Sequence, residues 1–207
     1  SHIRSSVPKS EKNNLDGKRF IFGADSDKQR VSSITSMIEE KGGQLEQSEC
    51  DCVIHITGNL PDFSKLTELS RDEWDKLVDQ FINTPAQWTQ SALKDFVPGG
   101  SDDPRKFKDT NGRIIIIGPA LPAGKKISGH ERAKVEVFRG ALRPFATTVN
   151  QELSDVLKSN VRVFLILPGT VDGKEPNNEN IVNTINYLMS DESQSSSEVI
   201  FCPDETR

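Results

Sequence analysis

The stretch Arg113-Ile114-Ile115-Ile116-Ile117, between Asn111-Gly112 and Gly118-Pro119, contains four consecutive β-branched apolar residues. A strand that is apolar at every position, rather than at alternate positions, is buried on both faces, which is typical of a parallel sheet covered by helices. A second run of this kind spans residues 161–167 and ends at Pro168-Gly169. Two such strands on either side of a long helical segment predict a β-α-β unit.

Signals of the same kind extend in both directions along the chain. The other predicted strands cover residues 18–23, 44–47, 51–57 and 198–202. Helices with one apolar face are predicted at residues 27–41, where Gly42-Gly43 ends the helix, and at residues 180–191. Strands that alternate with helices in this way predict an α/β fold, a three-layer Rossmann-like sandwich with a mostly parallel sheet.

Two capping boxes mark the starts of two further helices. Ser70 and Ser128 are each followed three residues later by a glutamate, so each pair can satisfy the free amide groups of a helix N-terminus. The first helix is predicted to stop before Thr84-Pro85, which we interpret as the start of another helix that reaches residue 96. The second is predicted to reach residue 156, with a kink at Pro144 because proline removes one backbone donor.

Composition limits the classes of partner. The 207 residues are 34% hydrophobic and 28% charged, with a formal net charge of −5, which fits a single folded domain. No stripe of lysine and arginine dominates, so we do not expect a nucleic-acid partner. No run of 18 apolar residues is present, and so we expect no membrane partner. Residues 1–15 are expected to form a flexible tail and residues 16–207 the folded domain.

The three cysteines do not predict a disulfide framework. Cys50 and Cys52 are separated by one residue and Cys202 lies far away, which also leaves no second ligand pair for a zinc site. We therefore expect reduced thiols, no metal and a cytoplasmic protein.

The order of these pieces resembles the short-chain dehydrogenase/reductase family. Residues 70–78 are similar to the helix after the family's fourth strand, residues 113–117 to its fifth strand, and residues 151–163 to the run into its sixth. Leu167-Pro168-Gly169 resembles the family's Pro-Gly turn, and residues 181–191 its penultimate helix. The resemblance implies a truncated version of that fold. Few residues separate the first strand from the one at 51–57, where the family has a further helix and strand beside the adenosine, and the substrate lid after Gly169 is short.

The resemblance also implies where a catalytic pair would lie. The family's acid is a tyrosine four residues before a lysine, on the helix after the fifth strand, but Tyr187 is the only tyrosine here and lies elsewhere. One alignment places His130 and Lys134 at the two positions, and the other places Val135 and Arg139 there. The first gives the catalytic candidates His130 and Lys134, because a histidine near a lysine can donate a proton.

The implied cofactor positions are altered in the same way. The family's glycine-rich turn, which lets a backbone approach a pyrophosphate, keeps only Gly23 here, and Asp25 and Asp27 put carboxylates where phosphates would lie. The family's Asn-Ala-Gly corresponds to residues 56–58, its helix asparagine to Phe81, and its strand-five serine to residues 118–119. The candidate cofactor-binding residues are Gly23, Ser26, Gly58, Gly118 and Gly169.

Three functions remain open from the sequence, the third being a binding module that holds a nucleotide or an acyl carrier without reacting. The leading hypothesis is a catalytically inert domain that binds no cofactor and has a structural, dimerisation or partner-supporting role. In length and in its losses the chain resembles the N-terminal unit of high-molecular-weight 3-oxoacyl-[acyl-carrier-protein] reductases, which links it to fatty-acid metabolism. The resemblance implies a homodimer, or a reductase-domain partner, held through residues 71–97 and 129–158, with Val135, Ala141, Thr148 and Leu157 as apolar contacts. The alternative is an oxidoreductase that uses NADPH or NADH with His130 and Lys134.

Overall fold

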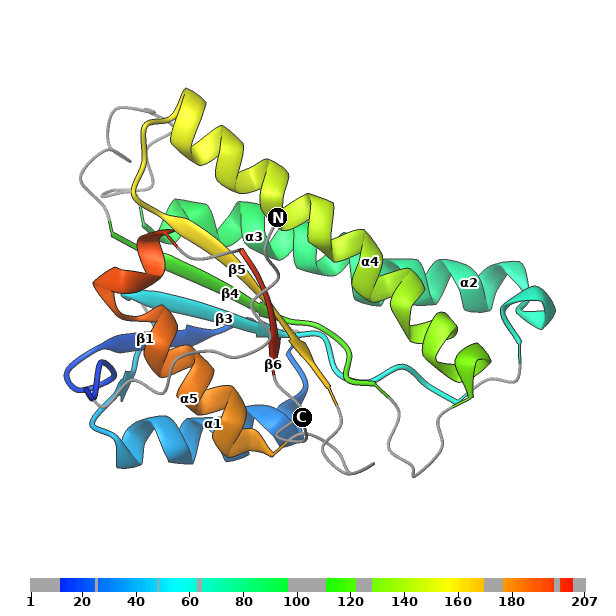
Figure 1. The fold of residues 1–207 in the computed structure, drawn as a ribbon, viewed down its shortest axis with the longest axis horizontal. Coiled ribbons are helices and arrows are strands. Elements are labelled where there is room, and N and C mark those ends of the chain that lie inside the picture. Colours follow the sequence, from blue (N-terminus) through cyan, green and yellow to red (C-terminus); the bar gives the residue numbers. More distant parts are fainter. Residues whose placement is uncertain are drawn as a thin grey trace.

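The computed structural model describes residues 12–24, 26–47, 49–62, 65–96, 111–121, 128–169, 177–195 and 198–202. A six-stranded sheet lies between two layers of helices (Figure 1). Its strands are β1 (Arg19–Phe22), β2 (Gln44–Leu45), β3 (Cys52–Ile56), β4 (Arg113–Ile117), β5 (Arg162–Pro168) and β6 (Val199–Cys202). Every neighbouring pair is parallel and the order is β2-β1-β3-β4-β5-β6, which confirms the predicted sandwich.

The helices divide between the two faces of the sheet. On one face α1 (Lys28–Glu40) and α5 (Asn178–Leu188) cover a core that includes Ile54 and Phe164. On the other face α3 (Thr84–Asp95) and α4 (Gly129–Gln151) cover a second core that includes Val53 and Leu165. Strands β3 and β4 are buried along their whole length, which the apolar run at residues 114–117 predicts for β4. Two short 3₁₀ segments, Leu66–Glu68 and Asp191–Ser195, lie between the larger elements.

Helix α3 begins at Thr84 with Pro85 in its first turn, as predicted, but the chain before it is helical rather than broken. Helix α2 (Arg71–Val78) runs through a π-helical turn, Asp79–Asn83, directly into α3. Within this turn the amide of Thr84 donates to the carbonyl of Asp79, one residue wider than in an α-helix. The next residue, Pro85, has no backbone amide hydrogen to donate. Helix α4 likewise continues through Pro144 to Gln151 and ends in a second π turn, Glu152–Val156.

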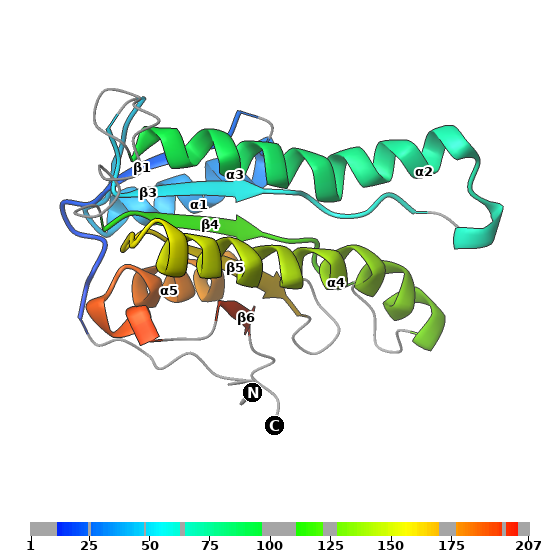
Figure 2. The same ribbon diagram turned by 90° about the horizontal axis from the view of Figure 1, so that it is seen from above.

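Helices α2 and α4 extend past the carboxyl ends of the strands (Figure 2). A third, small core joins them there, formed by Leu77, Phe81 and Phe138. The ring of Phe138 lies 5.5 Å from that of Phe81 and 5.8 Å from that of Trp74, which is 37% exposed. The extension is therefore held together by aromatic packing between the two helices.

Part of the expected tail belongs to the folded domain. Leu15 is fully buried, and the amide of Asn14 donates to the side-chain oxygen of Asn186 on α5 at 2.7 Å. The side chain of Asn186 in turn donates to the carbonyl of Lys12 at 3.0 Å. The packed chain therefore begins no later than Lys12, and residues 1–11 lie outside the described structure.

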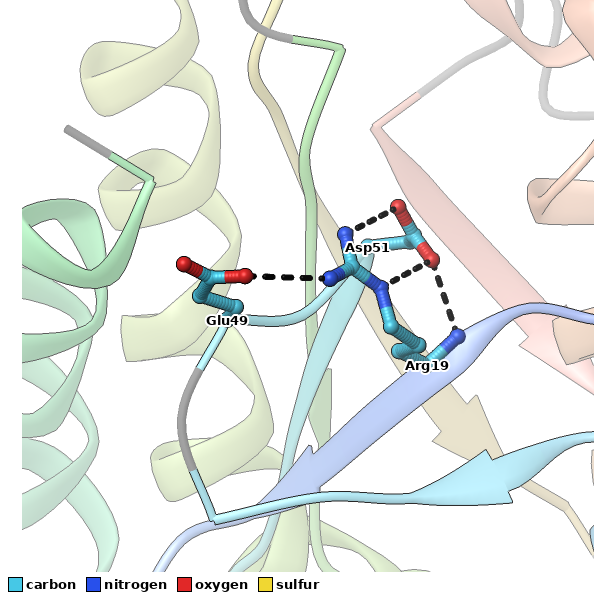
Figure 3. A network of polar contacts seen from close by, with 3 residues as sticks. All are labelled: Arg19, Glu49 and Asp51. Carbon is cyan, nitrogen blue, oxygen red and sulfur yellow. Dashed lines mark hydrogen bonds and ion pairs between the residues drawn. The ribbon is translucent and has the colours of Figure 1, made fainter. Parts of the chain in front are cut away.

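The connection from β2 to β3 is short because β2 has only two residues. It crosses the start of β1, where Arg19 pairs with Asp51 and Glu49 (Figure 3). The backbone amide of Arg19 also donates to the carboxylate of Asp51 at 2.9 Å. Burial by itself raises the pKa of the Asp51 carboxyl, but the hydrogen bonds and charge of Arg19 outweigh it, so the pKa lies below its usual value. A polar cluster thus replaces the crossover helix that a longer connection would supply.

No helix within the described part of the chain combines the length and the apolar character that a membrane crossing needs.

Candidate functional site

The carboxyl ends of the parallel strands form the edge where open α/β sheets bind ligands, particularly where the strand order changes direction. In this sheet the direction changes between β1 and β3. The turn from β1 to α1 and the loop after β3 meet at this point. It is the place where the fold positions a site, and three of the candidate residues, Gly23, Ser26 and Gly58, lie there.

The β1–α1 turn is folded back onto the end of β3. The Ser26 hydroxyl accepts a hydrogen bond from the amide of Ile56 at 3.1 Å, and the amide of Asp27 donates to the carbonyl of Ile56 at 3.1 Å. The carboxylate of Asp27 accepts from the amide of Arg30 at 2.8 Å and so caps α1. Ser26 and Asp27 are therefore engaged within the protein. Asp25, the other predicted carboxylate, lies outside the described residues.

Gly23 packs against an aromatic side chain. A Cβ atom at this position would collide with the indole of Trp88 on α3. The same indole lies 5.1 Å from the ring of His55, which is buried on β3 and has its Nδ1 atom 3.5 Å from the Ser26 hydroxyl. The close approach of Trp88 explains the glycine at position 23 without a ligand.

Gly58 lies next to two side chains, one from the N-cap of α1 and one from the π turn after α2. Its φ of +80° lies in the left-handed region that favours glycine, and a Cβ atom would lie 3.5 Å from the Asp27 carboxylate. The side chain of Gln80, in the π turn after α2, donates to the carbonyl of Thr57 at 3.2 Å. The Thr57 hydroxyl reaches the carbonyl of Ile117 at 3.3 Å. The backbone beyond β3 is therefore fixed from both sides.

At the ends of β4 and β5 a buried arginine donates hydrogen bonds to two backbone carbonyls. Nη1 of Arg139, on α4, donates to the carbonyl of Pro119 at 3.0 Å and to that of Pro168 at 2.6 Å. Arg139 is only 1% exposed, and its Nε atom lies 3.4 Å from the carboxylate of Glu136. Gly118 and Gly169 flank these carbonyls. The space beside Gly118 is filled by Leu167, and that beside Gly169 by the carbonyl of Cys202.

Burial lowers the pKa of the Arg139 guanidinium to about 10, although Glu136 acts in the opposite direction. Its side chain remains charged at neutral pH. A buried cation needs acceptors around it, and the two carbonyls and the Glu136 carboxylate supply them. The edge between β4 and β5 is thus occupied by a positive side chain whose Nη1 atom donates to the protein's own carbonyls.

The two alignments of the catalytic pair differ in where their residues lie. Val135 and Arg139 are buried, whereas His130 is exposed in the first turn of α4 and Lys134 is half-buried one turn later. The glutamate beside His130, Glu131, forms the capping box with Ser128. Tyr187 is buried on α5, in the opposite helix layer. Phe81, at the family's asparagine position, belongs to the small core between α2 and α4.

A polar cavity of about 300 Å³ remains near the direction change. It lies between the first turn of α1, the residues after β3 and the start of α5, where the side chain of Asn178 donates to the Ser33 hydroxyl at 2.8 Å. Asp27 and Arg30 contribute opposite charges to its wall. The predicted lid, residues 170–176, lies outside the described structure.

Comparisons with known proteins show what the chain is similar to in sequence and in fold. No family model matches the sequence. An uncharacterized oxidoreductase of Staphylococcus aureus (strain USA300) is 28% identical over 148 residues, which are 71% of this chain and 54% of that protein. A homologue in strain MRSA252 is 28% identical over 146 residues, 70% of this chain and 53% of its own length. The chain therefore matches about half the length of these curated relatives.

Solved structures show the same architecture. An enoyl-[acyl-carrier-protein] reductase (NADH) from Aquifex aeolicus VF5 aligns with a TM-score of 0.65 and 14% identity, over 91% of this chain and 96% of that chain. A short chain dehydrogenase from Mycobacterium smegmatis aligns with a TM-score of 0.63 and 14% identity, over 98% and 99%. A 3-ketoacyl-(acyl-carrier-protein) reductase from Brucella melitensis, complexed with NADH, aligns with a TM-score of 0.63 and 12% identity, over 92% and 98%. The chain has the fold of the short-chain dehydrogenases/reductases.

Sequence reasoning missed the residues that occupy the edge. Local patterns do not predict Trp88 or Gln80 as site residues. Arg139 is predicted only at the lysine position of the second alignment of the catalytic pair. One signal points to Arg139. It shares the helical spacing of Val135, Leu142 and Ala146, which are all buried, so its side chain had to be buried.

Proposed function

We propose that this chain is a catalytically inert domain of the short-chain dehydrogenase/reductase fold, with a structural, dimerisation or partner-supporting role. The observation that carries the proposal is Arg139. It lies four residues after Val135, in the alignment where these two replace the family's tyrosine and lysine, and its guanidinium fills the edge between β4 and β5. A valine has no proton to donate, and Nη1 of Arg139 already donates to two backbone carbonyls of the protein.

The first turn supports the same conclusion about cofactors. A pyrophosphate binds where backbone amides at a helix start are free to donate. Here the amides of Ser26, Asp27 and Arg30 donate to acceptors of the protein, and the Asp27 carboxylate adds a like charge. We therefore expect no binding of NADPH or NADH.

Calorimetric titration with NADPH and NADH tests this proposal, together with thermal unfolding in each cofactor. The expected result is no heat of binding and no change in melting temperature, because a compound that does not bind cannot stabilise the fold by mass action. Saturable binding of either cofactor would contradict the proposal that the domain binds neither NADPH nor NADH. Binding without turnover of a carbonyl substrate would leave a nucleotide-binding module.

The reductase reading is the second candidate, since the curated relatives carry the name oxidoreductase. His130 and Lys134 are four residues apart on α4, so their side chains lie one above the other. This candidate requires cofactor-dependent turnover that His130→Ala abolishes and Arg132→Ala, an exposed neighbour, leaves intact.

The partner-supporting role is attributed to the layer formed by α3 and α4. No charged residue occurs from Phe81 to Leu93, nor from Pro144 to Gln151. Depletion of charge is the compositional signal of an interface core. Two copies that each carry a net charge of −5 would also meet at least cost through a neutral face. We therefore propose a homodimer through this layer, with a reductase-domain partner as the other outcome.

The contact residues of this face differ in part from those predicted. Val135 is buried within the protein, whereas Thr148 is exposed and Ala141 and Leu157 are half-buried. Thr148→Glu is expected to shift the mass measured by sedimentation or light scattering from dimer to monomer. Ser32→Glu, which adds the same charge to an exposed position of α1, serves as the control and should leave the mass unchanged.

Two further assignments rest on resemblance and chemistry. The solved reductases of acyl-carrier-protein substrates support a link to a ketoacyl reductase of fatty-acid metabolism. The free cysteines Cys50, Cys52 and Cys202 are all buried, which fits a protein of the reducing cytoplasm.

A further inference from the structure

A single side chain joins the ends of two neighbouring strands. Nη1 of Arg139 has two hydrogens, and each is directed to a different carbonyl, that of Pro119 after β4 and that of Pro168 at the end of β5. The same two segments also contact through the backbone, where the amide of Leu121 donates to the carbonyl of Pro168 at 3.3 Å. Arg139 reaches them from α4, with its charge balanced by Glu136.

We propose that Arg139 closes the carboxyl edge between β4 and β5 from within, by taking acceptors that a ligand with cationic N–H donors would otherwise use. This inference goes beyond the proposed function, because it concerns ligands that donate hydrogen bonds rather than a dinucleotide. A carbonyl at the carboxyl end of a buried parallel strand has no further strand to pair with, so it must find a donor or face solvent. Arg139 supplies that donor to two carbonyls at once.

The acceptors that Arg139 uses define what the edge would bind if the side chain were removed. They are two carbonyl oxygens and one carboxylate, all negative ends of dipoles or charges. Such a set attracts a cation with N–H donors and repels a phosphate. The opened edge is therefore a site for a small guanidinium or ammonium group, which is the reverse of a dinucleotide site.

Hydrogen exchange of the Leu121 amide tests the closure. In the wild-type protein this amide is expected to exchange only with global unfolding, at the same free energy as the Ile115 amide in β4. In Arg139→Met its protection should fall by about tenfold or more relative to Ile115, because a hydrogen bond from a charged donor is lost beside it.

Arg143→Met is the matched control for this measurement. Arg143 also pairs with Glu136, at 3.0 Å, but it is half-exposed and sits one turn further along α4. Its replacement should leave the Leu121 amide protected. Local exchange of Leu121 in the wild-type protein, or equal protection in both methionine variants, would overturn the closure.

Binding of guanidinium ion tests the chemistry of the opened edge. Millimolar guanidinium chloride should raise the melting temperature of Arg139→Ala by about 2 to 4 °C over the same concentration of sodium chloride. The wild-type protein and Arg143→Ala should show no such rise. Absence of a guanidinium-specific rise in Arg139→Ala, or an equal rise in all three proteins, would contradict the acceptor site.

The two proposals fail in different experiments. Cofactor binding by the wild-type protein would overturn inertness and leave the exchange data on Arg139 as they stand. Unprotected Leu121 in a wild-type protein that binds no cofactor would overturn the closure and leave inertness in place.

Discussion

The two halves of the carboxyl edge are packed by different physical means. Between β1 and β3, beside the polar cavity, the packed groups are neutral, namely the backbone of the first turn, the Ser26 hydroxyl and the indole of Trp88 against Gly23. Between β4 and β5 it is filled by the charged side chain of Arg139. The first closure depends on shape and the second on electrostatics. Each half should therefore respond to a different kind of substitution.

The largest effect is expected at the charged half. Arg139→Met leaves the carbonyls of Pro119 and Pro168 without this donor and the Glu136 carboxylate without its buried partner, so we expect a loss of about 3 kcal/mol in the free energy of unfolding. Urea denaturation measures it. Arg143→Met should lose less than about 1 kcal/mol, because that ion pair is partly exposed. Equal losses in the two variants would remove the distinction between the halves.

A steric closure predicts coupling between Gly23 and Trp88. Gly23→Ala should destabilise the protein by about 2 kcal/mol, since the added methyl group would overlap the indole. In a Trp88→Ala background the same substitution should cost less than about 0.5 kcal/mol, because the space is then vacant. A double-mutant cycle by chemical denaturation gives the coupling energy. If the two effects simply add, Gly23 is required for a reason other than Trp88.

Ser26 provides a finer test of the neutral half. Ser26→Ala removes the acceptor of the buried Ile56 amide, so a loss of about 1 kcal/mol in stability is expected without any ligand present. Thermal unfolding of the variant alone provides the measurement. If stability is unchanged, the Ser26 hydroxyl does not contribute to folding, and another role, such as contact with a bound molecule, is indicated.

The smallest effect concerns pH and the opposite, amino end of β1. The pKa of Asp51 is lowered in the folded protein, so its ionised form stabilises the fold above the pKa of an unfolded aspartate. That stabilisation should be lost as the pH falls below about 4, through the lower folded pKa. Asp51→Asn is expected to flatten the acid limb of the stability curve slightly. An acid limb identical to that of the wild-type protein would show that the Arg19–Asp51 pair contributes nothing measurable.

Several features of the fold followed from local sequence patterns. The unbroken apolar runs at residues 113–117 and 161–167 required strands buried on both faces, and the capping boxes at Ser70 and Ser128 placed two helix starts correctly. The short distance between the first strands showed that a crossover was missing. These features depend on neighbours within a few residues, and such patterns report element type and burial directly.

Other features depended on packing between distant parts of the chain. Local rules placed a helix boundary at Thr84-Pro85, but the π turn before it keeps the helix continuous. The sequence leaves two alignments of the catalytic pair open, and it gives no sign that the packing of α4 brings Arg139 to the ends of β4 and β5. The neighbour of Gly23 is likewise a tryptophan on another helix.

The sequence by itself thus determined a parallel α/β sandwich without the family's tyrosine at its expected place. The tertiary structure decided what occupies the edge where a ligand would bind. The physical reason is that burial and helix starts are encoded by short-range periodicity, whereas the occupant of a shared edge is set by which side chains the packed helices bring to it.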